Sequence, residues 1–200
     1  LYTSLAIWIG ALLLLVAIKP RVSDKQLATL DNPKPRELYF GRYCVIALLS
    51  LLQTTVVGLG NMLFLGVQVT DPVLFMVCFW VSGLVDSLMI YTFVVSFANL
   101  GKAIAVIILI LQVTGGGGAY PLQLLPDFFQ VISVFLPATH TIDMMRAAMF
   151  GVYNGDFFVH LGYLLLFVAP TLLLGLVLRK PTEKLIIWFV EKVEESKMMA

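Results

Sequence analysis

Long stretches of hydrophobic residues without charge alternate with short polar ones along the chain. A helix crosses a bilayer with about 20 apolar residues, and five stretches qualify, the first of which we expect to extend before residue 1. They cover residues 1–18, 43–70, 73–101, 103–118 and 157–178. The pattern therefore predicts an all-α, polytopic helical membrane domain, formed as one unit by residues 1–200.

Composition narrows the class of protein. Hydrophobic residues make up 60% of the 200 residues and charged residues only 12%, and the mean hydropathy is +0.97. A soluble globular domain carries about 25% charged residues, so this class is excluded. The net charge of +1 gives no reason to expect a nucleic-acid partner. Cys44 and Cys78 both lie in apolar stretches, which argues against a disulfide framework.

The positions of lysine and arginine predict which loops are cytoplasmic, because cytoplasmic loops are enriched in these residues. If the first stretch enters from the outside, loop 19–42 and the tail after residue 178 both lie inside. All 13 basic residues except Arg146 are then cytoplasmic. We therefore expect loop 19–42 and the C-terminus in the cytoplasm. Within them, residues 24–31 are expected to form a short helix, and residues 182–198 an amphipathic helix on the inner leaflet.

The stretch between the fourth and fifth spans is irregular. Its apolar residues 128–136 are too few to cross, and a sixth crossing would place the basic tail outside. We therefore expect an extracellular re-entrant or interfacial helical hairpin over residues 119–152. The helix break and turn before it are assigned to Gly115, Gly116, Gly117, Gly118 and Pro121.

Asp86 is the charged residue inside the third stretch, with Ser82 one turn before it and Ser87 beside it. Inserting an aspartate at the centre of a membrane helix costs about 2.5–3.5 kcal/mol, so the side chain requires a partner, water or a proton. It would either face a polar cavity used by a substrate or proton, or clasp Gln53 or Asn61 on the second span. Both interpretations remain open.

The remaining polar residues carry no catalytic signature. Asp143 and Arg146 are three residues apart, so they can pair on one helix face, either as a local ion pair that orients the hairpin or as part of an outer gate. The glycines 115–118 are not followed by Gly-Lys-Ser/Thr, so they form no phosphate-binding loop. His140 and His160 are too few for a zinc protease. We expect no enzyme, no cofactor and no metal.

Several short motifs follow one another in a specific order. They are residues 40–43 (FGRY), 99–103 (NLGKA), 111–121 (LQVTGGGGAYP), 125–130 (LPDFFQ), 135–143 (FLPATHTID) and 145–146 (MR). In this order they resemble the C-terminal membrane domain of the YhgE/Pip proteins, the phage infection protein family of Gram-positive bacteria. That family belongs to the wider ABC-2-type exporter permeases. Residues 116–121 (GGGAYP) stand where the family often has Ser-Gly-Gly-Thr-Phe-Pro; the small-residue run, the aromatic and the proline are kept, and a hydroxyl is lost from the run.

The resemblance implies a larger protein than these 200 residues. A further span and a large extracellular domain would precede residue 1, making six spans with the hairpin between the fifth and sixth. The protein would be a homodimer in the plasma membrane of a Gram-positive bacterium. Lys34 and Arg36 in loop 19–42 would lie where such permeases contact an ATPase subunit. Relatives include phage receptors and an accessory component of type VII secretion.

Two functions of different classes are compatible with these observations. The first is the membrane domain of an exporter-like permease or secretion-associated protein, in which the hairpin closes the outer mouth and Asp86 lines a polar path. The second is a non-transporting anchor or scaffold for the large extracellular domain. A permease needs a hydrated path with polar groups facing it, whereas an anchor needs only a dry, packed bundle.

Overall fold

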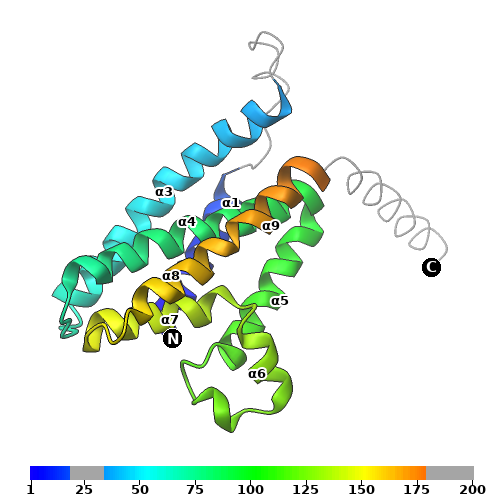
Figure 1. Ribbon diagram of the computed structural model, residues 1–200. Coiled ribbons are helices and arrows are strands. Elements are labelled where there is room, and N and C mark those ends of the chain that lie inside the picture. The colour runs from blue at the N-terminus through cyan, green and yellow to red at the C-terminus, as the bar shows by residue number, and fades with distance from the viewer. Residues whose placement is uncertain (19–33, 179–200) are drawn as a thin grey trace.

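The computed structural model describes residues 1–18 and 34–178, and these residues form helices without any strand (Figure 1). This confirms the all-α prediction. In chain order the elements are α1 (Tyr2–Ala17), α3 (Pro35–Leu63), α4 (Pro72–Phe97), α5 (Asn99–Gly115), the 3-10 turn η1 (Leu122–Leu124), α6 (Asp127–Ser133), α7 (Pro137–Phe150), α8 (Asp156–Leu166), α9 (Val168–Leu173) and the π-turn η2 (Leu174–Leu178). The helices predicted at 24–31 and 182–198 lie outside the described residues.

Three helical segments are long and apolar enough to cross a membrane: Pro35–Leu63, Pro72–Phe97 and Asp156–Val177. The last of these is α8 continued through α9 and η2. Helices α1 and α5 are also apolar but have 16 and 17 residues. Each of the five predicted stretches therefore contains a helix, and the described residues form a helical membrane domain.

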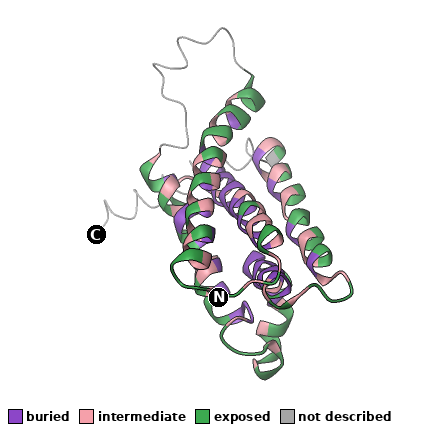
Figure 2. Cartoon of the chain, turned by 90° about the vertical axis from the view of Figure 1, so that its left-hand side faces the viewer, coloured by how far each residue is buried: buried purple, intermediate pink, exposed green. Residues whose placement is uncertain are grey.

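Helix α4 is the centre of the bundle. Two thirds (67%) of its most apolar segment is buried, against 22% for α3 and 17% for the segment from α8 onward. It packs against α1, α3, α5, α7, α8 and α9, and the buried positions in Figure 2 gather on the inner helices. A helix that is hydrophobic on all sides can be surrounded by neighbouring helices without burying charge, which is compatible with its central place.

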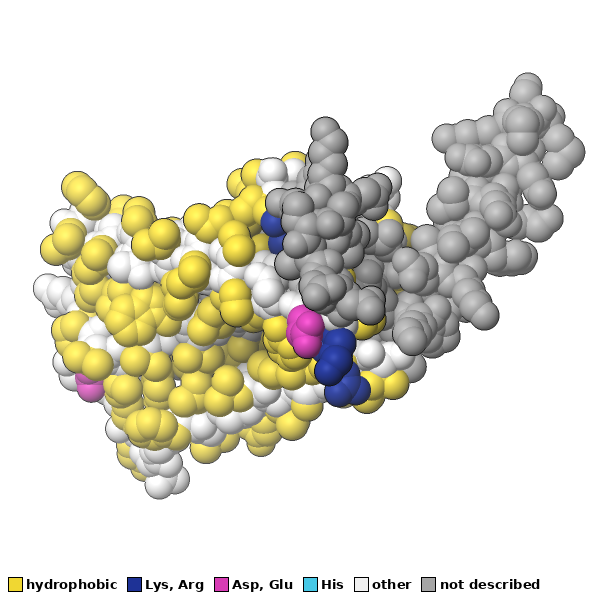
Figure 3. Space-filling model, turned by 90° about the horizontal axis from the view of Figure 1, so that it is seen from above, with side chains coloured by type: hydrophobic (Ala, Val, Ile, Leu, Met, Phe, Trp, Pro, Cys, Tyr) yellow, Lys and Arg dark blue, Asp and Glu magenta, His cyan; other side chains and the backbone are white. Residues whose placement is uncertain are grey.

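The outer face of the bundle is apolar. Hydrophobic side chains cover most of the face seen in Figure 3. On α3, Leu48, Leu52, Val56 and Leu59 are exposed at spacings of three and four residues, so they form one stripe along the helix. Exposure of such a stripe to water would be unfavourable, whereas contact with lipid would be favourable.

The second helix has different bounds from the predicted second span, 43–70. The second helix begins at Pro35 rather than Tyr43, because proline suits the first helical turn and Lys34 and Glu37 cap it through the bond from Lys34 N to Glu37 Oε2 at 3.1 Å. The residues from Pro35 onward in the predicted loop are thus helical. The same helix ends at Leu63 rather than Thr70.

The boundary between the third and fourth stretches also differs from the prediction. It lies at Ala98, where φ is +50°, and α5 starts at the next residue. The two helices meet so closely that a Cβ on Gly101 would collide with the backbone carbonyl of Phe93. Glycine at this position therefore allows the tight α4–α5 turn.

We predict that Gly101→Ala lowers the stability of the protein by about 1–3 kcal/mol, the usual cost of overpacking. The matched control is Gly162→Ala on α8, where an added Cβ has no other atom within 4 Å. There alanine should be neutral or stabilising by about 0.5–1 kcal/mol, because glycine is the weaker helix former. Thermal unfolding in detergent measures both, and equal midpoints would contradict the packing interpretation.

Candidate functional site

The carboxyl group of Asp86 lies in the buried middle of α4. The residue is 3% exposed, and its Oδ1 has no hydrogen-bond partner among the described residues. The predicted clasp to Asn61 is not made by this atom, since Asn61 bonds instead to Val57 O and to Thr3. Buried polar groups are nearly always hydrogen-bonded, so the unpaired oxygen makes Asp86 a candidate functional residue.

Polar residues around Asp86 connect α4 to α7. One turn before it, Ser82 Oγ lies 2.9 Å from Thr141 Oγ1, and Cys78 Sγ donates to Thr141 O at 3.5 Å. Thr139 Oγ1 on α7 and Gln112 Nε2 on α5 are also buried without a partner in the part of the chain described. Unpaired polar atoms thus occur on α4, α5 and α7, three helices that contact one another.

The glycine run ends α5 and is held by α7. The helix stops at Gly115, and Gly117 has a φ of +68°, which favours glycine. Arg146 Nη2 donates to the carbonyl of Gly117 at 2.7 Å, while its Nη1 lies 3.0 Å from Asp143 Oδ1. One guanidinium therefore joins the turn after α5 to the helix α7.

The other members of the run allow close packing. An added Cβ on Gly115 would contact Leu136 and Phe129 of the hairpin region, and one on Gly118 would lie 2.6 Å from Leu1 Cβ. Gly116 would meet the backbone of its own helix at Gln112 O. Pro121 follows as the residue preceding η1. Helices α6 and α7 both fall within the predicted hairpin 119–152, whose position relative to the membrane stays a prediction.

Two histidines extend the contact between α7 and α8. His140 Nε2 lies 3.0 Å from the carbonyl of Val134, and its Nδ1 lies 3.3 Å from His160 Nδ1 on α8. His160 Nε2 in turn lies 3.8 Å from Asp143 Oδ2. We call His140, His160, Asp143 and Arg146 the hairpin polar chain. Burial lowers the pKa of His140 in α7, and the nearby His160 acts in the same direction, against Val134 O and Asp143.

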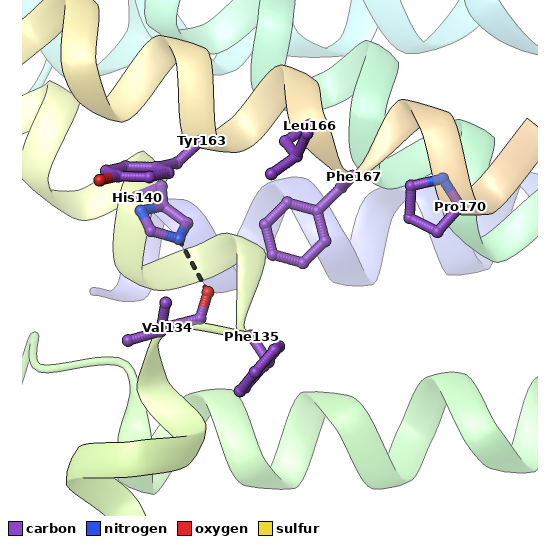
Figure 4. A pocket seen from close by; sticks show the side chains of 7 residues that line it. All are labelled: Val134, Phe135, His140, Tyr163, Leu166, Phe167 and Pro170. Atoms are coloured by element: carbon purple, nitrogen blue, oxygen red, sulfur yellow. Dashed lines mark hydrogen bonds between the residues drawn. The ribbon is translucent and has the colours of Figure 1, made fainter.

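A groove lies beside the polar chain, between the α6–α7 turn and the last span. Its volume is about 340 Å³, and Figure 4 shows His140 and Tyr163 at one end and Pro170 at the other. The remaining lining residues are apolar: Val134, Phe135, Leu166 and Phe167. Both ring nitrogens of His140 already have partners, so the groove suits an apolar occupant.

The candidate residues from the sequence fall into three places. Asp143, Arg146 and the glycine run meet at the hairpin, whereas Asp86 is buried in the bundle. Lys34 and Arg36 are exposed at the start of α3, which lies at the opposite end of the molecule from α6 (Figure 1). The contact of His160 with His140 was not predicted. The two residues are twenty positions apart in the sequence, and helical periodicity relates only residues within the same helix.

Comparison with known proteins identifies the family. The family profile for the ABC-2 family transporter protein matches residues 2–177. The chain belongs to the ABC-2 transporter family. Membrane domains of this family take part in transport and normally pair with ATPase subunits. This membership and the apolar helices make the protein a multi-pass membrane protein of permease type.

Two curated relatives support this assignment. The uncharacterized protein YhgE of Bacillus subtilis (strain 168) is 32% identical over 157 residues, which are 77% of this chain and 19% of the relative. Nodulation protein J of Rhizobium leguminosarum bv. viciae is 37% identical over 65 residues, 32% of this chain and 25% of the relative. The matches thus span a fifth to a quarter of these relatives. No solved structure matches the ABC-2 chain. The resemblance to the YhgE/Pip family is confirmed.

We predict that Arg146→Lys loosens the turn after α5 in this ABC-2 domain. Lysine keeps the charge but cannot donate to Gly117 O and Asp143 from one planar group. A spin label at Tyr120, which is exposed, should gain mobility, and stability should fall by about 1 kcal/mol. Arg36→Lys at the other end of the molecule is the control. Unchanged mobility in Arg146→Lys would show that the bond to Gly117 does not hold the turn.

Proposed function

We propose that this ABC-2 chain is the membrane domain of a YhgE/Pip-like permease or secretion-associated protein that exports its substrate across the plasma membrane of a Gram-positive bacterium. The observation that carries the proposal is the buried carboxyl of Asp86 in the most buried helix, whose Oδ1 has no hydrogen-bond partner among the described residues. A bundle that served only as an anchor would gain nothing from a group that is costly to bury. In a permease the same group lines a polar path.

The hairpin supports an outer gate in this proposal. Arg146 joins the turn after α5 to α7, and the polar chain joins α7 to α8. The hairpin therefore contacts the helices on both sides of it in the chain. A segment held by a few polar contacts at a glycine-rich turn can move with those helices, which is the property that closing the outer mouth requires.

The start of α3 supports the ATPase contact. Lys34 and Arg36 are exposed, and the helix begins with a capped polar turn rather than a lipid-facing one. Their place in loop 19–42 puts them on the cytoplasmic side under the charge rule. Two exposed cations at a helix start would meet an acidic surface on an ATPase subunit.

A homodimer completes the proposal. Helix α5 presents Ile107, Ile110 and Val113 as an exposed apolar stripe, which suits either lipid or a second copy. The few polar residues along the spans favour an amphipathic substrate, such as a lipid-linked molecule or a peptide. Use of the protein by phage would depend on the extracellular domain expected before residue 1.

The alternative is a membrane anchor or scaffold, such as an accessory component of type VII secretion. The apolar packing around α4 favours it, because most of this helix is buried among hydrophobic side chains. In this case Asp86 would be a structural residue only. The two functions differ in whether an ATPase binds and whether Asp86 matters to transport.

A pull-down of the full-length protein from mild detergent tests the ATPase contact. We expect a nucleotide-binding ATPase to be recovered and to be lost in the double variant Lys34→Glu, Arg36→Glu, because the charge of the contact surface is reversed. Lys102→Glu is the matched control, since Lys102 is also predicted to be cytoplasmic but lies outside loop 19–42. Recovery of secretion components alone would favour the scaffold.

Substitution of Asp86 tests the polar path. We predict that Asp86→Ala, at unchanged expression, abolishes most export or stimulation of the ATPase. Ser87→Ala is the control, because Ser87 is a buried neighbour whose hydroxyl donates to Leu84 O of its own helix. Full activity in Asp86→Ala would remove this residue from the mechanism.

A further inference from the structure

The hairpin polar chain has a defined hydrogen-bond direction. A carbonyl oxygen only accepts hydrogen bonds, so His140 Nε2 carries the hydrogen in its 3.0 Å contact with Val134 O. A neutral imidazole has one N–H, which leaves His140 Nδ1 as an acceptor. The hydrogen in the 3.3 Å contact between the rings therefore comes from His160 Nδ1.

This direction leaves one nitrogen without a hydrogen at the other end. A neutral His160 with its hydrogen on Nδ1 has a bare Nε2, which lies 3.8 Å from Asp143 Oδ2. The carboxylate also only accepts, and it pairs with the Arg146 guanidinium 3.0 Å away. Two acceptors thus face each other, and the geometry lacks one proton between them.

A single added proton removes this conflict. It gives His160 an N–H on Nε2, directed at Asp143, whichever ring keeps the hydrogen between the two Nδ1 atoms. The imidazolium and the carboxylate then attract each other across the α7–α8 contact. A second proton would place hydrogens on both facing Nδ1 atoms, and the two rings would repel each other.

We propose that the His140–His160 pair is a proton-binding site, at which one added proton fastens α8 to α7 through His160 Nε2 and Asp143. Histidine is the side chain that ordinarily changes its charge between about pH 5 and pH 8. The site is open to protons, because the side chains of His160 and Asp143 are 28% and 29% exposed. This inference goes beyond the proposed function and holds whether the domain transports or anchors.

The surroundings contain few other charges. Around the rings, α7 supplies Asp143 and Arg146, and Tyr163 of α8 stacks near both histidines. Helix α9 has no titratable side chain. The other titratable residues have separate places. Asp156 accepts from Phe157 N at the start of α8, Cys78 bonds to Thr141 O, Tyr91 bonds to Tyr39 O, Asp86 is buried in the bundle, Lys102 lies in the first turn of α5 and Asp127 begins α6. The added proton is therefore balanced by Asp143.

Imidazole nitrogen NMR of the full-length protein in nanodiscs tests the site directly. The spectrum of His160→Asn assigns the signals of His160. At about pH 8 we expect the neutral ring with its hydrogen on Nδ1, and at about pH 5 a ring with hydrogens on both nitrogens. A neutral His160 with its hydrogen on Nε2 at about pH 8, or a ring that stays neutral to about pH 5, would overturn the proposal.

A distance measurement tests the fastening. Spin labels at Val131 on α6 and Leu165 on α8, both exposed, report how the hairpin sits against the last span. We expect the distance distribution to narrow as the pH is lowered from about 8 to about 5. This narrowing should be lost in His160→Asn, because asparagine can replace the Nδ1 donor but has no atom at Nε2.

Two further variants distinguish loss of the proton-binding site from destabilisation of the hairpin by the substitution itself. Asp143→Asn removes the anion and should also abolish the narrowing, even if His160→Asn folds poorly. Asp156→Asn is the matched control, because it removes a carboxylate from the same end of α8 but keeps the oxygen that caps the helix, so the narrowing should persist. A pH response that survives in both His160→Asn and Asp143→Asn would refute the site.

Discussion

The structure depends on the rule that polar groups within a bilayer must find partners inside the protein. Helix carbonyls have a second lone pair, and neighbouring helices use it. Trp8 on α1 donates to Ala105 O on α5 at 3.1 Å, and Ser50 and Tyr43 on α3 donate to carbonyls of α4 at 2.9 and 2.8 Å. These bonds position the helices around α4 without placing charge in the core. Asp86 is the charged residue among the exceptions: its Oδ1 stays unpaired among the described residues, as do Gln112 Nε2 and Thr139 Oγ1.

Small residues are the geometric counterpart of these bonds. A hydroxyl reaches a carbonyl of the next helix only if the two backbones approach closely, and Ser50 reaches Gly83 O where an added Cβ would collide with Thr54. Close approach of two backbone segments is also needed at Gly101 and at the turn after Gly115. The glycine run therefore has two effects. It lets the chain turn sharply, and it leaves the carbonyl of Gly117 accessible to Arg146.

Much of this arrangement follows from local sequence, and the remainder depends on tertiary contacts. The apolar stretches predict the helices, and Gly115 ends α5 where the run begins. The start of α3 at Pro35 was missed because the first turn is polar, and apolar length alone cannot detect a capped polar turn. The break falls at Ala98, which is neither proline nor glycine, so the pattern placed it three residues too late, at Gly101. The pairing of His140 with His160 depends on how α7 packs against α8, and this packing cannot be predicted from the spacing of residues in the sequence.

Helix α7 contacts three parts of the domain, and the permease and the anchor differ in whether they need these contacts. It contacts α4 through Thr141, which pairs with Ser82 one turn before Asp86, the turn after α5 through Arg146, and α8 through His140. A passive anchor needs no element that joins the helix bearing a buried carboxyl to both segments flanking the hairpin. A permease does, because access to an internal polar site must be coupled to the outer mouth. The connectivity of α7 therefore favours transport, independently of what the substrate is.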